Sequence, residues 1–259
     1  MLELCTLASG SSGNAVLVFS DTTSLLIDAG ISAKRICDGL KGLGMSPMDL
    51  DAICVTHSHS DHISGLRVLL KRVTAGIHTT HDTAKAIASQ VEGAAGRIHI
   101  IHPMEPFSVG DLTVQAFSTP HDAPGSVGYT VTDGVRKCCV VTDLGFVTEE
   151  VRQGIFGSQL ALVEANHDVD WLMSGPYPYY LKQRILGDGG HLSNEASGAL
   201  CCELVEHGTE KLVLAHLSQE NNTPERAKSV VCSMLSRQGL GHVPVTVAPR
   251  SVCCAPIEV

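Results

Sequence analysis

The segment Thr56-His57-Ser58-His59-Ser60-Asp61-His62 places three imidazoles and one carboxylate within six residues. It follows the apolar run Ala52-Ile53-Cys54-Val55, which predicts a buried strand over 52–56. Side chains two residues apart on an extended segment point the same way, so His57 and His59 can share one metal ion. A histidine-rich surface turn is the alternative. Four ligand-competent side chains between a strand and a helix favour the metal site.

A helical pattern begins where this cluster ends. Apolar residues at 63, 66, 69 and 70 have helical spacing and predict a helix over 62–72. Asp61 and His62 therefore open a new element and face a second position close to the first. The cluster predicts two neighbouring ions.

The composition indicates an ordered globular protein. Hydrophobic residues make up 44% of the 259 residues and charged residues 17%, so we expect one α/β domain over residues 1–259. The N-terminus has no basic region, and no apolar run approaches the roughly 18 residues of a membrane span. We expect a cytoplasmic protein with no membrane partner; the oligomeric state is open.

The cysteine content and the net charge further limit the functions that this protein can have. Six of the ten cysteines lie in adjacent pairs and no CxxC is present, which indicates reduced, mostly buried thiols. The formal charge of −9 disfavours a protein coated by nucleic acid, because that affinity usually rests on Lys and Arg. Two divalent ions would add about four positive charges where a phosphate sits, which weakens this objection.

Short apolar strands and helical patterns alternate along the whole chain. Strands are predicted over 2–7, 14–19, 24–28, 52–56, 98–102, 112–118, 126–132, 137–142, 159–163, 211–215 and 244–247. Helices are predicted over 32–43, 62–72, 81–91, 147–154, 194–206 and 223–237. This mixture favours sheets covered by helices, with the site at the carboxyl ends of strands.

Three further strands end in a side chain that can bind metal. Apolar runs lead to His121, to Asp143 and to His216. A single His or Asp after a strand is more often a turn residue than a ligand. Together with the cluster, these three residues indicate one shared site on rigid elements.

The order HxHxDH, lone His, lone Asp, final His resembles the ligand pattern of the metallo-β-lactamase superfamily over nearly the whole chain. Five shorter strings resemble its YycJ/WalJ group: Ala8-Ser9-Gly10-Ser11-Ser12-Gly13-Asn14, Leu26-Ile27-Asp28-Ala29-Gly30, Glu164-Ala165-Asn166-His167-Asp168, Gly190-His191-Leu192-Ser193-Asn194 and His216-Leu217-Ser218-Gln219-Glu220-Asn221-Asn222. The resemblance implies a four-layer αββα sandwich with the site at one edge between two sheets.

The resemblance also implies which residue binds which ion. His57, His59 and His121 would bind the first ion, Asp61, His62 and His216 would bind the second, and Asp143 would bridge them. Imidazole and carboxylate ligands suit two divalent ions per chain, either Zn²⁺ or Mn²⁺, and Fe²⁺ also fits. Asp28 fits a carboxylate that orients a ligand imidazole, with an ordinary turn residue as the alternative.

His191 is the candidate catalytic residue outside the metal ligands. It lies before a helical run with no strand behind it, so we prefer His216 as the ligand. By analogy with nuclease branches such as tRNase Z, His191 would contact the scissile phosphate or protonate the leaving oxygen, and Glu164 would polarise it. Asp61 is expected to serve catalysis as well as metal binding. A capping or loop histidine is the alternative for His191.

Two segments are candidates for substrate contacts. The turn with Ser9, Ser11, Ser12 and Asn14 can direct N–H groups and hydroxyls at an anion, or can be only a tight hairpin turn. The stretch from Trp171 to Arg184 interleaves aromatic and basic residues that can stack on bases and hold phosphates. A satellite core under a long loop is its alternative. The substrate-binding candidates are Ser9, Ser11, Ser12, Asn14, Tyr177, Lys182, Arg184 and Ser193.

The leading hypothesis is a dinuclear metal-dependent phosphodiesterase that attacks nucleic acid with a hydroxide shared by two ions. The resemblance implies an exonuclease of 5′-to-3′ polarity, with DNA favoured over RNA. Roughly 70 residues separate Asp143 from His216, too few for the inserted domain of the RNase J group, and no tRNase Z-like arm is evident. The alternatives are a glyoxalase II- or lactonase-like hydrolase of esters, thioesters or lactones, and a non-catalytic metal-stabilised partner in cell-wall stress signalling.

Overall fold

Successive side chains of each strand point into two different apolar layers. In β3 (Ser24–Ile27), Leu25 and Ile27 pack in a central layer, while Leu26 packs on the opposite face. In β10 (Lys137–Val141), Cys138 lies in the same central layer and Cys139 lies on the outer face, which accounts for the adjacent cysteines. Both faces of each strand are apolar, so both faces of each sheet must be covered.

The computed structural model describes residues 1–259 and contains two seven-stranded mixed sheets. The first has the order β14 (Ile257–Glu258), β1 (Glu3–Ala8), β2 (Ala15–Phe19), β3, β4 (Ala52–Cys54), β5 (Gly76–Thr79) and β6 (Ile98–Ile100). The second has the order β13 (Val245–Val247), β12 (Lys211–Ala215), β11 (Leu160–Glu164), β10, β9 (Val127–Thr132), β8 (Leu112–Ser118) and β7 (Phe107–Val109). In each sheet antiparallel pairs give way to parallel ones, from β3 to β6 and from β10 to β13.

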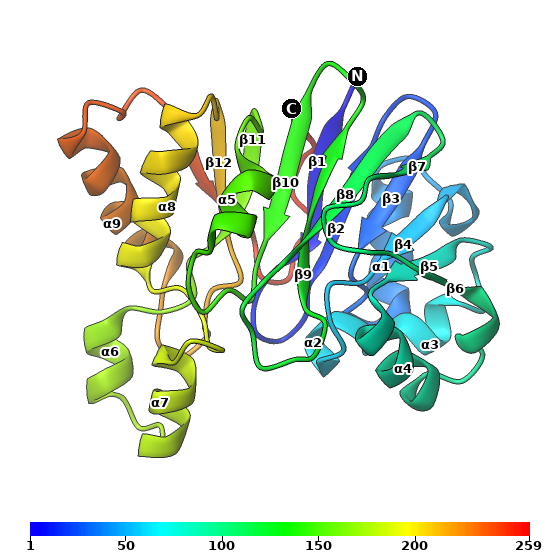
Figure 1. The fold of residues 1–259 in the computed structure, drawn as a ribbon, viewed down its shortest axis with the longest axis horizontal. Coiled ribbons are helices and arrows are strands. Elements are labelled where there is room, and N and C mark those ends of the chain that lie inside the picture. The colour runs from blue at the N-terminus through cyan, green and yellow to red at the C-terminus, as the bar shows by residue number, and fades with distance from the viewer.

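Helices cover the outer face of both sheets (Figure 1). The first sheet packs against α1 (Ala33–Gly42), α3 (Leu66–Leu69) and α4 (His81–Gln90), and the second against α5 (Glu149–Ile155), α8 (Asn194–Glu206) and α9 (Pro224–Arg237). With the central layer between the sheets, these packings give three apolar layers and four layers of structure. The predicted αββα sandwich is confirmed.

Two differences from the predicted elements affect the site. The predicted helix over 62–72 is divided into α2 (Ser60–Ile63) and α3, because Gly65 donates its N–H to Ala29 O at 2.8 Å and Asp61 O accepts from Asn14 instead of from Gly65. The aromatic stretch, expected as a loop, forms α6 (Val169–Ser174) and α7 (Tyr179–Leu186), which project beyond the sandwich on the side of α2 (Figure 1). None of the helices is long and apolar enough to cross a membrane.

Backbone hydrogen bonds fix the histidine cluster from behind. Asn14 donates its N–H to Asp61 O at 2.8 Å, and Gly30 donates its N–H to Asn14 O at 2.8 Å. Ala29 donates in the same way to His62 O at 2.8 Å. The β1–β2 turn and the segment after β3 therefore set the positions of Asp61 and His62 in α2.

Replacing Gly30 with alanine is expected to destabilise the protein by about 3 kcal/mol or more, because an overpacked backbone contact cannot relax cheaply. An added Cβ would lie 1.7 Å from Asp61 O and 2.8 Å from Asn14 N. Urea unfolding of the apo and metal-loaded protein measures the effect. The control is Gly42→Ala at the end of α1, where an added Cβ meets nothing within 4 Å. Equal unfolding midpoints for the two variants would refute this packing argument.

Candidate active site

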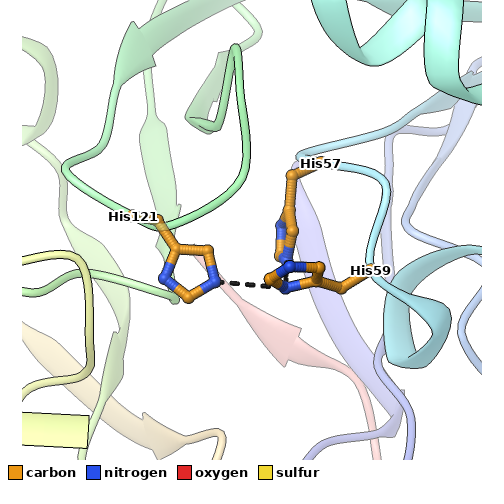
Figure 2. A group of neighbouring side chains, drawn as sticks. All are labelled: His57, His59 and His121. Carbon is orange, nitrogen blue, oxygen red and sulfur yellow. Dashed lines mark hydrogen bonds between the residues drawn. The ribbon is translucent and has the colours of Figure 1, made fainter. Parts of the chain in front are cut away.

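Three histidines from two separate segments converge on one point. His57 and His59 follow β4, with His59 immediately before α2, and His121 follows β8. His59 Nδ1 lies 3.1 Å from His57 Nε2 and 3.3 Å from His121 Nε2, and Figure 2 shows the three rings facing one another. Nitrogen atoms so close cannot all carry protons, and a shared cation resolves the repulsion. The structure thus brings together the three residues expected around the first ion.

A second group lies beside the first. Asp61 Oδ2 is 3.4 Å from both His62 Nε2 and His216 Nε2. The ligand atoms of these three residues are within 4.8 Å of one another. His216 reaches this point from the end of β12, whereas His191 belongs to a different group, with Asp143, Glu164 and His216. The geometry therefore favours His216 over His191 as the third member of the second site.

Asp143 lies between the two groups. Its Oδ2 is 3.3 Å from His62 Nε2, and its Oδ1 is 3.7 Å from His121 Nε2. The residue is 2% exposed and Oδ2 has no hydrogen-bond partner. A buried carboxylate oxygen without a donor is costly unless a cation satisfies it. This orphaned oxygen fits the expected bridge between two ions.

Three residues at or beside this centre adopt the left-handed backbone region. They are Asp28 at φ 62° and His216 at φ 55°, each directly after a strand, and Asp143 at φ 58°, two residues after the end of β10. Only one other non-glycine residue, Met104, shares this region. Such conformations cost free energy and persist where the surrounding structure requires them. They turn the side chains from the strand ends into the site.

The electrostatic environment suits cations. Burial acts to lower the pKa of His62, but Asp143 and Asp28 outweigh it and raise that pKa well above its usual range. Burial also opposes a raised pKa at His216, where Asp143, Asp61 and Glu164 prevail. By contrast, burial and the neighbouring His62 lower the pKa of His57, which leaves the neutral imidazole that a metal requires. The donor set therefore fits two divalent ions.

Asp28 orients one of the ligand imidazoles. Its Oδ2 accepts a hydrogen bond from His62 Nδ1 at 2.7 Å, and its Oδ1 accepts from Thr56 N–H at 2.9 Å. With Nδ1 held in this way, His62 presents Nε2 to the second site. The carboxylate therefore has the geometry expected of a residue that supports a ligand.

Replacing Asp28 with asparagine is expected to weaken metal binding by about 10- to 100-fold, because the imidazole loses its charged acceptor. Asparagine tolerates the left-handed backbone, so the change removes charge without straining the chain. Titration of the apo protein with Zn²⁺ or Mn²⁺ by calorimetry measures the affinities. Asp38→Asn, on the exposed face of α1, is the matched control. Unchanged affinity in Asp28→Asn would show that the carboxylate only shapes the turn.

Glu164 holds two histidines at once. It is fully buried at the end of β11, and its Oε1 accepts from His191 Nδ1 and His216 Nδ1, both at 2.8 Å. Its Oε2 accepts the N–H groups of Leu144 and Leu192 at 3.0 and 3.1 Å. Burial acts to raise the pKa of Glu164, but His191 and His216 keep it below its usual range. The sequence suggested the link to His191 and missed the link to His216.

His191 differs from most of the candidate ligands in two ways: its side chain is partly exposed, and one of its ring nitrogens has no protein partner. Its side chain is 21% exposed and lines the main cavity, and Nε2 has no protein partner. Burial lowers its pKa, but the Glu164 carboxylate reverses this and raises it. A raised pKa favours the protonated imidazole, in which Nε2 can donate a proton or a hydrogen bond into the cavity.

The cavity over the two groups has a volume of about 380 Å³. Beside the metal-binding side chains, it is lined by Ser11, Asp122, Asn166, Tyr177, Leu181, Arg184, Ile185 and Ser218. Arg184 on α7 pairs with Asp122, whose Oδ1 is 3.6 Å from His59 Nε2. Asp122 was not predicted as a site residue, although it directly follows the ligand candidate His121. This ion pair joins α7 to the metal centre.

Several residues expected to contact substrate have other partners. Ser9 Oγ accepts from His216 N–H at 2.9 Å, and Asn14 Nδ2 donates to Asp61 O at 3.4 Å, so both bond to the backbone of candidate ligands. Lys182 Nζ donates to Met173 O and Gly175 O at 2.7 and 2.8 Å, at the end of α6. Ser193 Oγ caps α8 by accepting from Ala196 N–H at 3.2 Å. Ser12 is exposed outside the cavity, which leaves Ser11, Tyr177 and Arg184 as residues that line it.

Comparison with known proteins agrees with this fold and site. Residues 23–217 match the family described as the beta-lactamase superfamily domain, and the chain belongs to the metallo-β-lactamase superfamily. It is 37% identical to the exodeoxyribonuclease WalJ of Streptococcus pneumoniae over 91% of this chain and 88% of that protein. It is 34% identical to the exodeoxyribonuclease YycJ of Bacillus anthracis over 93% of this chain and 91% of that protein. The predicted resemblance to the YycJ/WalJ group is confirmed.

Solved structures show the same architecture at low identity. The metallo-β-lactamase fold protein YhfI from Bacillus subtilis aligns with a TM-score of 0.72 at 16% identity, covering 98% of this chain and all of that one. Between Asp143 and His216 the chain contains only the strands β11 and β12 and the helices α5, α6, α7 and α8. No additional domain is inserted there, as the length of this segment predicted.

Proposed function

We propose that this protein is a two-metal exodeoxyribonuclease that removes nucleotides from the 5′ end of DNA. The observation that carries the proposal is the combination of a complete ligand set with 34–37% identity to two exodeoxyribonucleases over about nine-tenths of the chain. The polarity and the preference for DNA over RNA are part of the proposal. A cytoplasmic location stays a prediction of the sequence.

The chain's own residues supply positioning and a proton. One ion would be held by His57, His59 and His121. The other ion would be held by Asp61, His62 and His216, and Asp143 would contact both ions. Two divalent ions bound in this way activate water and neutralise charge on a phosphodiester. His191, oriented by Glu164 through Nδ1, would donate a proton from Nε2 to the leaving oxygen. This division of roles separates metal ligands from the proton donor.

The residues that line the cavity support cleavage at the end of a DNA strand. The cavity is lined by Leu181 and Ile185 of α7 and by Tyr177, which lies just before this helix. The three residues are four positions apart, which is a helical spacing. A cavity of about 380 Å³ is closer to one nucleotide than to a double helix. Tyr177 would stack on the terminal base, and Arg184 would contact a flanking phosphate. The terminal nucleotide would thus lie between α7 and the metals.

The test compares matched oligonucleotides with the metal-loaded protein. Single- and double-stranded DNA and RNA, with and without a 5′-phosphate and labelled at either end, are digested with Mn²⁺ or Zn²⁺. We expect mononucleotides released from the 5′ end, with DNA cut faster than RNA.

Tyr177→Ala is expected to raise the KM for single-stranded DNA by about 10-fold, in keeping with roughly 1–3 kcal/mol for one stacked base.

The same assay includes generic ester, thioester and lactone substrates. Turnover of one of these with no hydrolysis of any oligonucleotide would contradict the nuclease proposal and support the small-molecule alternative. Full metal occupancy with no turnover of any substrate would support the non-catalytic alternative.

A further inference from the structure

Three cysteines that are far apart in the sequence meet at the start of β1. Cys5 Sγ lies 3.4 Å from Cys253 Sγ and 3.9 Å from Cys254 Sγ. Cys5 is fully buried, and the other two are partly exposed on the segment that runs from β13 to β14. Cys254 donates its N–H to Thr6 O at 3.0 Å, which fixes this segment beside β1. The three thiols form a separate cluster that the proposed nuclease reaction does not use.

One of the three sulfurs accepts several hydrogen bonds. Thr6 donates to Cys254 Sγ both from its N–H, at 3.1 Å, and from its hydroxyl, at 3.2 Å. A neutral thiol is a weak acceptor, so two donors directed at one sulfur favour its thiolate form. Cys5 Sγ donates to Cys254 O at 3.1 Å, and the nearby Cys5 thiol contributes most to holding the pKa of Cys254 below its ordinary value. A partly exposed thiolate beside a buried thiol is the arrangement of a reactive dithiol.

We propose that Cys254 and Cys5 form a reversible redox-modification site that hydroperoxides convert to a disulfide. In the first step the Cys254 thiolate attacks an oxygen of the hydroperoxide, the O–O bond breaks, and the alkoxide or hydroxide released takes up a proton. Cys254 becomes a sulfenic acid. In the second step Cys5 loses its proton and its sulfur attacks Cys254 Sγ. The S–O bond breaks, and the hydroxide leaves as water with that proton.

The geometry supports Cys5 as the second thiol. The two sulfurs must approach by roughly 2 Å to reach bonding distance, which side-chain rotation on two adjacent segments can supply. The hydrogen bond with Cys254, followed by burial, raises the pKa of the Cys5 thiol. Oxidation of Cys254 removes the negative charge beside Cys5 and so favours its deprotonation. Two electrons pass from the two thiols to the peroxide, and a dithiol reductant reverses the bond by exchange.

The disulfide would fasten a segment that supports the metal site. Pro249 O accepts from Ser9 N–H at 3.2 Å, and Ser9 Oγ accepts from the N–H of the ligand candidate His216 at 2.9 Å. Arg250 Nη2 donates to Ser218 O at 3.2 Å on the other side of the same turn. A bond between residues 5 and 254 therefore closes nearly the whole chain into one loop and fixes the segment behind His216.

The test treats the metal-loaded, full-length protein with about one equivalent of hydrogen peroxide. Peptide mapping by mass spectrometry without reductant is expected to find one disulfide that joins the Cys5 peptide to the Cys253-Cys254 peptide. Cys253→Ser should retain this bond, Cys254→Ser should form it at least about 10-fold more slowly, and Cys5→Ser should stop at a sulfenic acid trapped by dimedone. Cys37 and Cys232, two partly exposed thiols elsewhere, serve as internal controls and should stay reduced.

Two further measurements do not depend on the folding of a variant. In the native wild-type protein at pH 7, iodoacetamide is expected to label Cys254 about 10-fold faster than Cys37 or Cys232. The oxidised protein should unfold at a higher urea concentration than the reduced one, and dithiothreitol should reverse the shift. Equal labelling of all partly exposed cysteines, or an unchanged disulfide in Cys254→Ser, would overturn the proposal.

Discussion

Replacing Asp143 with alanine is expected to lower kcat/KM on 5′-phosphorylated single-stranded DNA by about 10³-fold or more and to reduce bound metal below two ions per chain. The carboxylate lies between the two ligand groups, and its buried Oδ2 has no other partner. Without it neither ion keeps its full set of ligands. Kinetics with end-labelled DNA and elemental analysis of dialysed protein measure the two effects.

Backbone strain complicates the alanine variant. Asp143 has a φ of 58°, where alanine costs about 1–2 kcal/mol while asparagine is better tolerated. Asp143→Asn should therefore fold like the wild-type protein in a urea titration and still lose activity and metal. Asp38→Ala on α1 controls for removal of an exposed carboxylate. Two ions per chain in a folded Asp143→Asn protein would exclude a bridging role.

Replacing His191 with alanine is expected to lower kcat by about 10²- to 10⁴-fold, the range for loss of a general acid, while both ions remain bound. His191 is outside the two ligand groups, its Nδ1 is held by Glu164, and it lines the cavity. KM for DNA should change less than kcat, because the proton is needed mainly in the transition state. Single-turnover kinetics on oligonucleotides separate the two parameters.

His216→Ala is the informative comparison for this variant. It removes a side chain that is 1% exposed and only 3.4 Å from Asp61 Oδ2, so we expect loss of one ion as well as of activity. His81→Ala, at the exposed start of α4, controls for removal of an imidazole. If His191→Ala loses an ion and His216→Ala keeps both, the assignment of the second ligand must be exchanged.

Much of the fold followed from local patterns. Apolar runs bounded by Gly, Ser and Asp predicted most of the strands, because alternate side chains enter two apolar layers and few polar residues interrupt them. Three strands were missed. β5, β7 and β14 have four, three and two residues, and none lies in a longer apolar run such as Ala52 to Val55, which indicated the equally short β4. The pair α6 and α7 was also missed, since these helices have only six and eight residues and bury a single side chain, that of Leu172.

The candidate ligands could be proposed from the sequence because most of them follow an apolar strand, and strand ends gather at one edge of a sheet. Among the residues that support them, only Asp28 and the link between Glu164 and His191 were proposed from the sequence. Glu164 binds His191 and His216 from positions 27 and 52 residues apart in the chain. Arg184 and Asp122 are 62 residues apart. Such pairs depend on how sheets and helices pack, and no local pattern records them.

The sequence by itself predicted the chemistry of the cluster at 57–62, because three imidazoles and one carboxylate crowded between a strand and a helix favour the binding of a cation. The family resemblance already implied a division of the candidate ligands between two positions. Only the tertiary structure showed the two groups side by side, with the unpartnered oxygen of Asp143 between them. It also assigned Lys182 and Ser193 to helix ends and brought Cys5 to Cys254 across 249 residues. The physical reason is that spacing along a strand determines which way a side chain points, whereas packing of distant elements determines what it meets.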